Sequence, residues 1–350
     1  MLSTHELKQI QLSRQHLTEK ADKITVCHDL NGLQAQIMVN VFYSLKIRCN
    51  EEIKKDNFGD GLVKNWTVRG TIHAFAAEDL GLFKYNHSER YHLSHDWDIE
   101  KMRWHCRIPP DRLEYIAKFI VDKVASGVTA RENLKEECYR AGMTEAEGAF
   151  VFDQWGGLFH HLCDRGFLCH KVCEKKEFMI CPPFIPMEKD DAVLEQVRRY
   201  FAHFAPATVK DAAYYFGCSQ THIKEIMQKL PLKQIEVDGK HYFYSEELKS
   251  DYPVIPHCIL LAGFDQLMLG YQKKDSIYLP EKYIRGIFNL AGIVMPPILL
   301  DGVVAGRWQK KNTKMIFEMF GDISAQNRKH IELVMEETFN DIRKVEWAFI

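Results

Sequence analysis

The chain has 350 residues, of which 46% are hydrophobic and 27% are charged, with a formal net charge of −2. This composition excludes a disordered chain, and the length predicts roughly two to four domains. No apolar run approaches the roughly 18 residues that cross a bilayer, and the N-terminus lacks the apolar core of a signal peptide. We therefore expect a cytoplasmic protein with no membrane partner.

Two glutamines stand inside the apolar stretch LNGLQAQIMVN, at Gln34 and Gln36. A side-chain amide that is buried without partners costs about 1–3 kcal/mol. Residues two apart do not share a face of a helix, but they do in an extended segment. We therefore expect the pair to straddle a helix end or to lie in an extended turn near Gly32. The residues alone favour amides bonded to backbone at a crowded junction over a catalytic pair.

The stretch WTVRGTIHAF alternates, which predicts a strand with Arg69, Thr71 and His73 on one face. An arginine, a hydroxyl and an imidazole on one face can bind a phosphate. They can equally form the polar side of a strand, and the pattern does not decide between the two.

Two later segments share the pattern of a capped helix. Thr129 is followed three residues later by Glu132, and Thr208 is followed by Asp211 at the same spacing. The hydroxyl can accept from the free amides of a helix start while the acid bonds back, as in a capping box. Asp is a less usual partner than Glu, so the second box is expected to be the weaker one.

Each capped helix is followed by a glycine turn, at Gly142 or Gly217, and then by a second helix. This is helix-turn-helix spacing. Each second helix leads into a predicted hairpin, with a turn at Asp238-Gly239 in the later one and near residues 174–176 in the earlier one. A helix-turn-helix followed by a hairpin is a winged helix, and at least two are expected in tandem.

From Asp251 onward, short apolar runs are separated by proline, glycine and Asp-Gly turns. This pattern predicts an antiparallel β-rich domain, built as a small barrel and closed by a helix within residues 324–344. The stretch LLDGVVAGRW predicts a hairpin with Asp301-Gly302 at its tip.

Basic residues gather at two places that can contact nucleic acid. They are Lys171, Lys175 and Lys176 in the earlier hairpin, and Arg307, Lys310 and Lys311 near the C-terminus. A charge run is most often only a solvated face. The segment from Thr208 to Asp251 is not basic, so contact through its second helix is less favoured.

Several other kinds of site are not expected. The cysteines and histidines between residues 160 and 181 do not have the spacing of paired zinc knuckles, so we predict no metal. The ten cysteines are expected to be reduced thiols. No GxGxxG that opens a helix and no phosphate-binding loop occur, so no nucleotide cofactor is expected. A GxSxG nucleophile elbow is also absent.

Five stretches carry a resemblance to a known family. They are GLQAQ, VRGTIHAF, APAT, LLAGFDQLMLGY and LLDGVVAGRW, in this order. Together they resemble the winged-helix DNA glycosylases of the AlkZ type, over about residues 5–345. The resemblance implies an α+β fold with three tandem winged helices that form a concave DNA-binding surface, followed by a C-terminal β-barrel. The domains expected are residues 1–105, 106–187, 188–250 and 251–350.

The resemblance also implies a catalytic Gln-apolar-Gln motif, which falls on Gln34, Ala35 and Gln36. Some relatives have aspartate at the last position, and this chain does not, which bears on the lesions it accepts. For Arg69 and His73 the resemblance implies no more than contacts with the site or the DNA backbone.

The activity implied is that of a monofunctional DNA glycosylase that removes cationic N-alkylated purines and unhooks interstrand crosslinks. A purine alkylated at N7 already carries positive charge and leaves as a neutral base, so the enzyme has mainly to hold a water and stabilise the oxocarbenium-like sugar. The expected partner is double-stranded DNA with alkylated bases, bound by a monomer without cofactors. The alternatives are a non-catalytic winged-helix DNA-binding regulator or architectural protein, and a protein-interaction scaffold.

Overall fold

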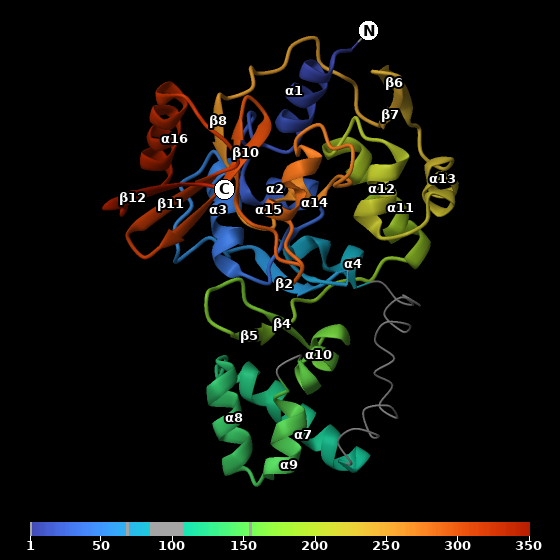
Figure 1. Ribbon diagram of the computed structural model, residues 1–350. Helices are drawn as coiled ribbons and strands as arrows, with labels where there is room; N and C mark the ends of the chain where they lie inside the picture. The colour runs from blue at the N-terminus through green and yellow to red at the C-terminus, as the bar shows by residue number, and fades with distance from the viewer. Residues whose placement is uncertain (1, 68–69, 85–107, 154–155) are drawn as a thin grey trace. The chain divides into compact units, whose positions relative to one another are not determined.

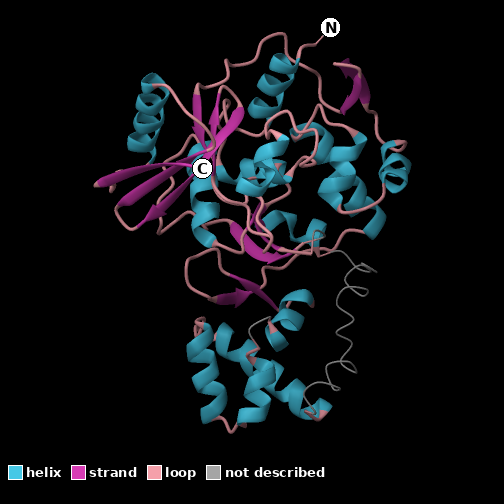
Figure 2. Ribbon diagram, in the orientation of Figure 1, coloured by secondary structure: helices cyan, strands magenta, loops and turns pink. Residues whose placement is uncertain are grey.

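The computed structural model describes residues 2–67, 70–84, 108–153 and 156–350. The chain forms two compact units (Figures 1 and 2). The split unit comprises Met1–Lys54 with Leu194–Ile350, and the middle unit comprises Lys55–Val193. The segment with Gln34 and Gln36 thus folds with the C-terminal part of the chain. The four consecutive domains expected from the sequence remain a prediction, because the division into two units is coarser than a division into four domains.

The middle unit contains a small sheet and several helices. Its elements are β2 (Leu62–Trp66), β3 (Ile72–Ala76), a 3-10 turn η1 (Ala77–Asp79), α4 (Leu80–Phe83), α7 (Pro110–Ala125), α8 (Arg131–Arg140), α9 (Glu145–Val151), α10 (Gly157–Asp164), β4 (Leu168–His170) and β5 (Phe178–Ile180). The strands lie in the order β3-β2-β4-β5. Phe159, Leu168 and Phe178 belong to the buried core beneath the helices.

The stretch predicted as one alternating strand is instead a hairpin, so that prediction is wrong. Trp66 of β2 pairs with Ile72 of β3. Between them, Gly70 has a φ of 70° and its amide donates to the carbonyl of Thr67, which closes a turn. Glycine adopts this left-handed conformation without a Cβ clash, so the chain reverses here instead of continuing extended.

The capping box predicted for Thr129 and Glu132 does not form. The residue before α8 is Ala130, which offers no side-chain cap, while Thr129 donates instead to Glu177 at 3.0 Å. A capping box does occur one helix later, where Thr144 and Glu147 bond reciprocally at the start of α9. Glu177, which directly precedes β5, thus binds the hydroxyl that the local spacing assigned to a helix start.

The split unit combines helices from both ends of the chain with a sheet. Its first part holds α1 (Thr4–Arg14), α2 (Lys23–Asp29), β1 (Leu33–Gln34) and α3 (Met38–Arg48). Its second part holds α11 (Lys189–His203, whose first residues belong to the middle unit), α12 (Val209–Phe216), α13 (Gln220–Met227), β6 (Lys233–Val237), β7 (Lys240–Tyr244), β8 (Cys258–Leu260), α14 (Gln266–Leu269), η2 (Glu281–Tyr283), α15 (Ile284–Ile287), β9 (Pro297–Leu300), β10 (Val303–Lys311), β11 (Lys314–Met319), α16 (Ala325–Thr338) and β12 (Lys344–Phe349). Of the helices described in either unit, none is long and apolar enough to cross a membrane.

The C-terminal strands form an open sheet in the order β12-β11-β10-β9-β8. The predicted barrel is not found among the described residues, because β12 and β8 are the two edges of this sheet. The predicted antiparallel pairing holds from β8 to β11, whereas β11 and β12 run parallel with α16 as the crossover. The hairpin at Asp301-Gly302 is confirmed, with φ angles of 47° and 70°.

Helices α12 and α13 precede the hairpin β6–β7, as the sequence predicts, and α11 comes before them. The box of Thr208 and Asp211 is present at the start of α12, and Gly217 ends that helix with a left-handed φ of 61°. Asp238 and Gly239 both have positive φ, which gives the hairpin turn whose twist suits two antiparallel strands. The ring of Tyr200 in α11 packs against two aromatic rings of α12 in the core, tilted against Tyr215 and edge-on to Phe216.

Candidate active site

Gln34 and Gln36 lie where an extended segment enters a helix, as the two-residue spacing predicts. Gln34 ends β1, and Ile37 is the extended N-cap residue of α3. The amide Nε2 of Gln34 donates a hydrogen bond of 3.1 Å to Oε1 of Gln36. Gln34 is 9% exposed, whereas Gln36 is exposed. The pair therefore has a buried member, Gln34, that is bonded to an exposed member, Gln36.

The turn before the pair adopts a backbone conformation that few residues accept. Asn31 and Gly32 have φ angles of 51° and 81°. Asparagine and glycine are the residue types that tolerate this left-handed region. The amide of Gly32 donates to the carbonyl of Cys27 at 2.8 Å, which ends α2 and turns the chain into β1.

Three elements from the C-terminal part of the split unit hold this turn. The side chain of Asn31 donates to the carbonyl of Gln196 in α11 at 3.0 Å. The side chain of Gln266 in α14 donates to the carbonyl of Gly32 at 2.9 Å. The hydroxyl of Tyr215 in α12 lies 3.4 Å from the carbonyl of Leu30. The backbone that leads into Gln34 is therefore fixed by side chains that are distant in sequence.

The far end of α3 is held by a buried ion pair. The Arg48 guanidinium donates two bonds to Asp265, of 2.8 and 2.7 Å, and both side chains have no exposed surface. Asp265 also accepts from the amide of Leu267 and so caps α14. A two-pronged guanidinium–carboxylate pair of this kind fixes orientation as well as distance. Because Asp265 and Gln266 are adjacent, the start of α14 holds both the turn and α3.

Sequence reasoning missed these supporting residues. The signal was present in the stretch LLAGFDQLMLGY, which holds an acid and an amide among apolar residues. Gly263 of the same stretch packs against the first turn of α3, where an added Cβ would lie 2.8 Å from Nδ2 of Asn40. This stretch thus contacts both the turn before Gln34 and helix α3. Only the tertiary contacts reveal its supporting role.

Apolar side chains border the outer glutamine. Ile37 is 40% exposed and Val39 is 38% exposed, although both are large and apolar. Exposed apolar side chains beside the exposed amide of Gln36 form a surface with both polar and apolar parts. Such a surface suits a partner of the same mixed character, as a nucleotide is.

His73 does not occupy the position that its predicted DNA contact needs. It has no exposed surface, and its Nδ1 lies 3.0 Å from both the Thr67 hydroxyl and the Thr71 carbonyl. The imidazole therefore braces the β2–β3 turn from inside. Arg69 lies outside the described residues.

The six basic residues predicted to contact DNA divide into two sets. Lys171, Arg307 and Lys310 pair with Glu177, Glu318 and Asp341, respectively. The other three, Lys175, Lys176 and Lys311, are exposed and have no ion pair within the part of the chain that the structure describes.

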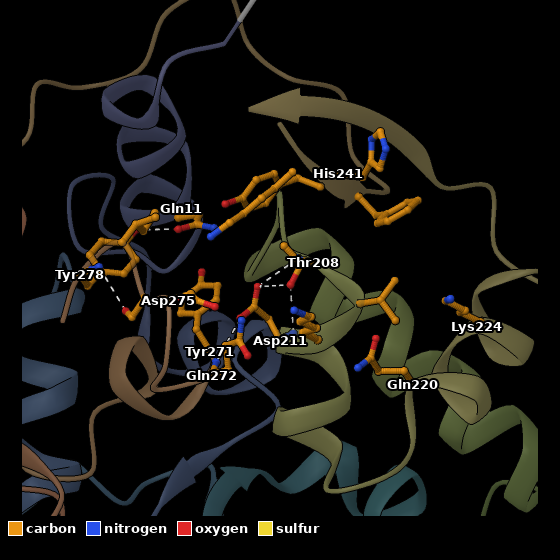
Figure 3. Close-up of a pocket in the computed structure, with 17 residues that line it drawn as sticks. Gln11, Thr208, Asp211, Gln220, Lys224, His241, Tyr271, Gln272, Asp275 and Tyr278 are labelled. Carbon is orange, nitrogen blue, oxygen red and sulfur yellow. Dashed lines mark hydrogen bonds between the residues drawn. The ribbon is translucent and has the colours of Figure 1, made fainter. Parts of the chain in front are cut away.

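A cavity of about 400 Å³ lies between α12, β7 and the loop after α14 (Figure 3). Burial raises the pKa of the Asp211 carboxyl at its wall, although Thr208 and the amide of Gln272 donate to it. Neither glutamine of the pair lines this cavity. Three exposed lysines that sequence reasoning missed do line it: Lys210, Lys224 and Lys240.

The cysteines of the middle unit do not assemble a metal cluster in the described ranges. Cys169 and Cys181 place their sulfurs 3.2 Å apart, and burial contributes to a raised pKa for Cys163, to about 12. Within the described part of the chain, His16, Asp29 and His203 of the split unit form a group of three whose ligand atoms lie close enough to hold a metal ion.

Comparisons with known proteins agree with this architecture. A family model described as DNA glycosylase AlkZ-like matches residues 28–338. An interstrand DNA cross-link repair glycosylase of Streptomyces sahachiroi is 21% identical over 323 residues, which cover 87% of this chain and 86% of that protein. The solved structure of the Streptomyces sahachiroi DNA glycosylase AlkZ matches with a TM-score of 0.75 at 20% identity, over 100% of both chains. The chain belongs to the AlkZ-like family of DNA glycosylases.

Proposed function

We propose that this DNA glycosylase hydrolyses the N-glycosidic bond of cationic N-alkylated purines, with Gln34 and Gln36 as its catalytic pair. The observation that carries the proposal is the bond from Gln34 to Gln36 at the exposed start of α3. The proposal extends to interstrand crosslinks, which the name of the Streptomyces relative specifies for that protein.

The chemistry suits two amides because the leaving group brings its own charge. A purine alkylated at a ring nitrogen departs as a neutral base, so no protonated acid is required. What remains is to place a water and to stabilise the oxocarbenium-like sugar. A glutamine carbonyl can accept a hydrogen bond from the water and direct the negative end of its dipole toward the developing cation.

The two glutamines have different roles in this scheme. One lone pair of Gln36 Oε1 accepts from Gln34, which leaves the second lone pair for a water. Gln36 is exposed and touches the nucleotide, while the buried Gln34 fixes the rotamer of Gln36. Ile37 and Val39 pack against the sugar and the neighbouring base.

The open position of Gln36 is compatible with crosslinked DNA. A nucleotide that is joined to the opposite strand cannot swing freely into a closed pocket. The cavity of Figure 3 is lined by other residues, and Gln36 stands on the surface of the split unit. Excision at this surface therefore does not require the crosslinked base to leave the duplex first.

DNA binding rests on phosphate contacts from several winged helices. In our proposal, one is formed by α8, α10 and the β4–β5 hairpin, and another by α12, α13 and the β6–β7 hairpin. Lys175, Lys176 and Lys311 are the exposed cations available from the predicted set. The protein acts as a monomer in the cytoplasm, and it leaves an abasic site because the motif places no lysine to form a Schiff base.

The test is release of N7-methylguanine from a DNA duplex by the wild type, Gln34→Ala and Gln36→Ala. All three proteins are first shown to fold and to bind DNA equally. Loss of release in both variants is the expected result. If the wild type binds the duplex but releases no base from it or from an N7-linked crosslink, the proposed substrate class is wrong.

A further inference from the structure

His16, Asp29 and His203 bring metal-type ligand atoms together at the ends of three helices of the split unit. His16 follows α1, while Asp29 and His203 are the last residues of α2 and α11. Oδ2 of Asp29 lies 2.8 Å from Nε2 of His16 and 3.3 Å from Nδ1 of His203. All three ligand atoms lie within 4.8 Å of one another. We propose that these residues form a binding site for a divalent transition-metal ion, Zn²⁺ above all.

The backbone at His16 indicates that its side chain has a specific role. Its φ is 60°, in the left-handed region, directly after a helix C-cap. Glycine is the usual residue there, since a side chain costs about 1 kcal/mol. This chain has a histidine at the position, and the ring is directed at Asp29.

The ring of His16 faces an oxygen at each nitrogen. Nδ1 lies 3.3 Å from the carbonyl of Glu19, and Nε2 lies 2.8 Å from Asp29. A neutral imidazole has a single N–H, so one of the two contacts needs a second proton or a metal ion. If Nδ1 donates to the Glu19 carbonyl, the lone pair of Nε2 is directed into the cluster, which is the tautomer that binds a metal.

A second layer of bonds orients the carboxylate. Oδ1 of Asp29 lies 3.0 Å from Nδ1 of His28, which leaves Oδ2 directed at the two flanking rings. The carbonyl of His28 accepts in turn from Arg199 at 3.3 Å. Outer partners of this kind are a regular feature of metal sites, where they fix the ligands.

The donor set and its spacing suit zinc. Two imidazole nitrogens and one carboxylate oxygen, with room for water, form a common zinc ligand set, with bonds of about 2.0–2.2 Å. Ligands of a tetrahedral ion then lie about 3.3 Å apart. The contact of His203 with Asp29 already has this distance, while the contact of His16 must widen by about 0.5 Å. The three side chains are 13%, 11% and 24% exposed, so an ion and its water ligand can enter.

The bound ion would tie α1, α2 and α11 together directly before the turn that leads to Gln34. Asp29 is followed at once by Leu30, whose carbonyl is one of the contacts that hold this turn. The role is structural, because none of the three ligands belongs to the glutamine pair. The inference therefore does not depend on the proposed substrate.

The experiment is a titration of the full-length protein, freed of metal with a chelator, with Co²⁺ as a spectroscopic probe and then with Zn²⁺. The wild type should bind one Co²⁺ per chain, seen by its visible absorption, and Zn²⁺ should displace it and raise the Tm. His16→Ala and His203→Ala should abolish stoichiometric binding. His28→Ala should weaken it about 10–100-fold, and the exposed His222→Ala should leave it unchanged.

Asp29→Asn serves if the histidine variants fail to fold, since it keeps the shape of the side chain and removes the anionic ligand. The proposal is overturned if the folded wild type binds no Co²⁺ stoichiometrically, or if Asp29→Asn binds it equally well. The histidines and Asp29 are then a hydrogen-bonded cluster without an ion. Base release, measured on the same samples, separates this outcome from failure of the proposed glycosylase mechanism.

Discussion

The side-chain amide of Gln266 donates a hydrogen bond of 2.9 Å to the backbone carbonyl of Gly32, two residues before Gln34. The two residues are 234 positions apart. Gln266 is 1% exposed and touches no substrate in our scheme, so it is a positioning residue for the glutamine pair. Its removal should affect catalysis through the turn.

Gln266→Met removes this donor and keeps the size of the side chain. We expect a loss of about 1–3 kcal/mol in the free energy of unfolding, because a buried carbonyl loses its partner. We also expect slower base release at saturating enzyme, with DNA affinity unchanged. Gln15→Met is the matched control: Gln15 is also a buried glutamine with one donated bond, to Tyr271 at 2.8 Å. Equal base release by the two variants would contradict the positioning role.

Arg48→Met should destabilise the split unit strongly. It leaves Asp265 as a buried charge without its partner, which costs about 3–5 kcal/mol. Urea denaturation followed by circular dichroism gives the value. Lys233→Met removes one partner of the exposed Lys233–Glu247 pair and should cost less than about 1 kcal/mol. A cost for Arg48→Met as small as that of Lys233→Met would show that the buried pair does not hold α3.

Lys175→Ala combined with Lys176→Ala should weaken DNA binding and also make it less dependent on salt, because phosphate contacts are lost. Each lost phosphate contact reduces the magnitude of the negative slope of log affinity against log salt by about 0.9. Lys171→Ala is the control, since this lysine already pairs with Glu177. Binding measured at several salt concentrations decides the matter, and an unchanged slope in the double variant would remove the β4–β5 hairpin from the DNA surface.

His257 should stabilise the protein more at acidic than at alkaline pH. A hydrogen bond with Asp301, which is the larger cause, and a second one with Asn327 raise the pKa of the His257 imidazole above its usual value. The stabilisation is therefore complete below about pH 6.5, the value for the unfolded chain, and is lost as pH rises through the higher folded pKa. Because the side chain is 35% exposed, the effect is about 0.5 kcal/mol.

The comparison is the unfolding free energy lost in His257→Ala at about pH 5.5 and at about pH 8. The loss should be larger at the lower pH. In an Asp301→Asn background this difference should shrink, because the main cause of the raised pKa is gone. A larger loss at the higher pH would reverse the sign and contradict the assignment.

Local patterns predicted much of the fold. The spacing of Gln34 and Gln36 predicted an extended segment at a helix start, and the Asp-Gly pairs predicted two hairpins. These features depend on a few neighbouring residues. Thr129 shows the limit, because the same Thr-x-x-acid spacing that caps α12 gives no cap at α8, where Glu177 competes for the hydroxyl.

Contacts between distant residues could not be predicted. Arg48 and Asp265 are 217 positions apart, and nothing near either residue indicates that the other neutralises it. The sheet of the C-terminal part was expected to close into a barrel, but its final strand arrives parallel through the α16 crossover and remains an edge. The cluster of His16, Asp29 and His203 is likewise assembled from three separate helices.

The most direct test of the central claim is a double-mutant cycle on the glutamine pair. Base release from N7-methylguanine duplex is measured in single turnover for the wild type, Gln34→Ala, Gln36→Ala and the double variant. If Gln34 acts by orienting Gln36, the double variant should be no slower than Gln36→Ala, because residues that act as a unit are not additive. Rate losses that simply multiply, or wild-type rates in both single variants, would contradict the account.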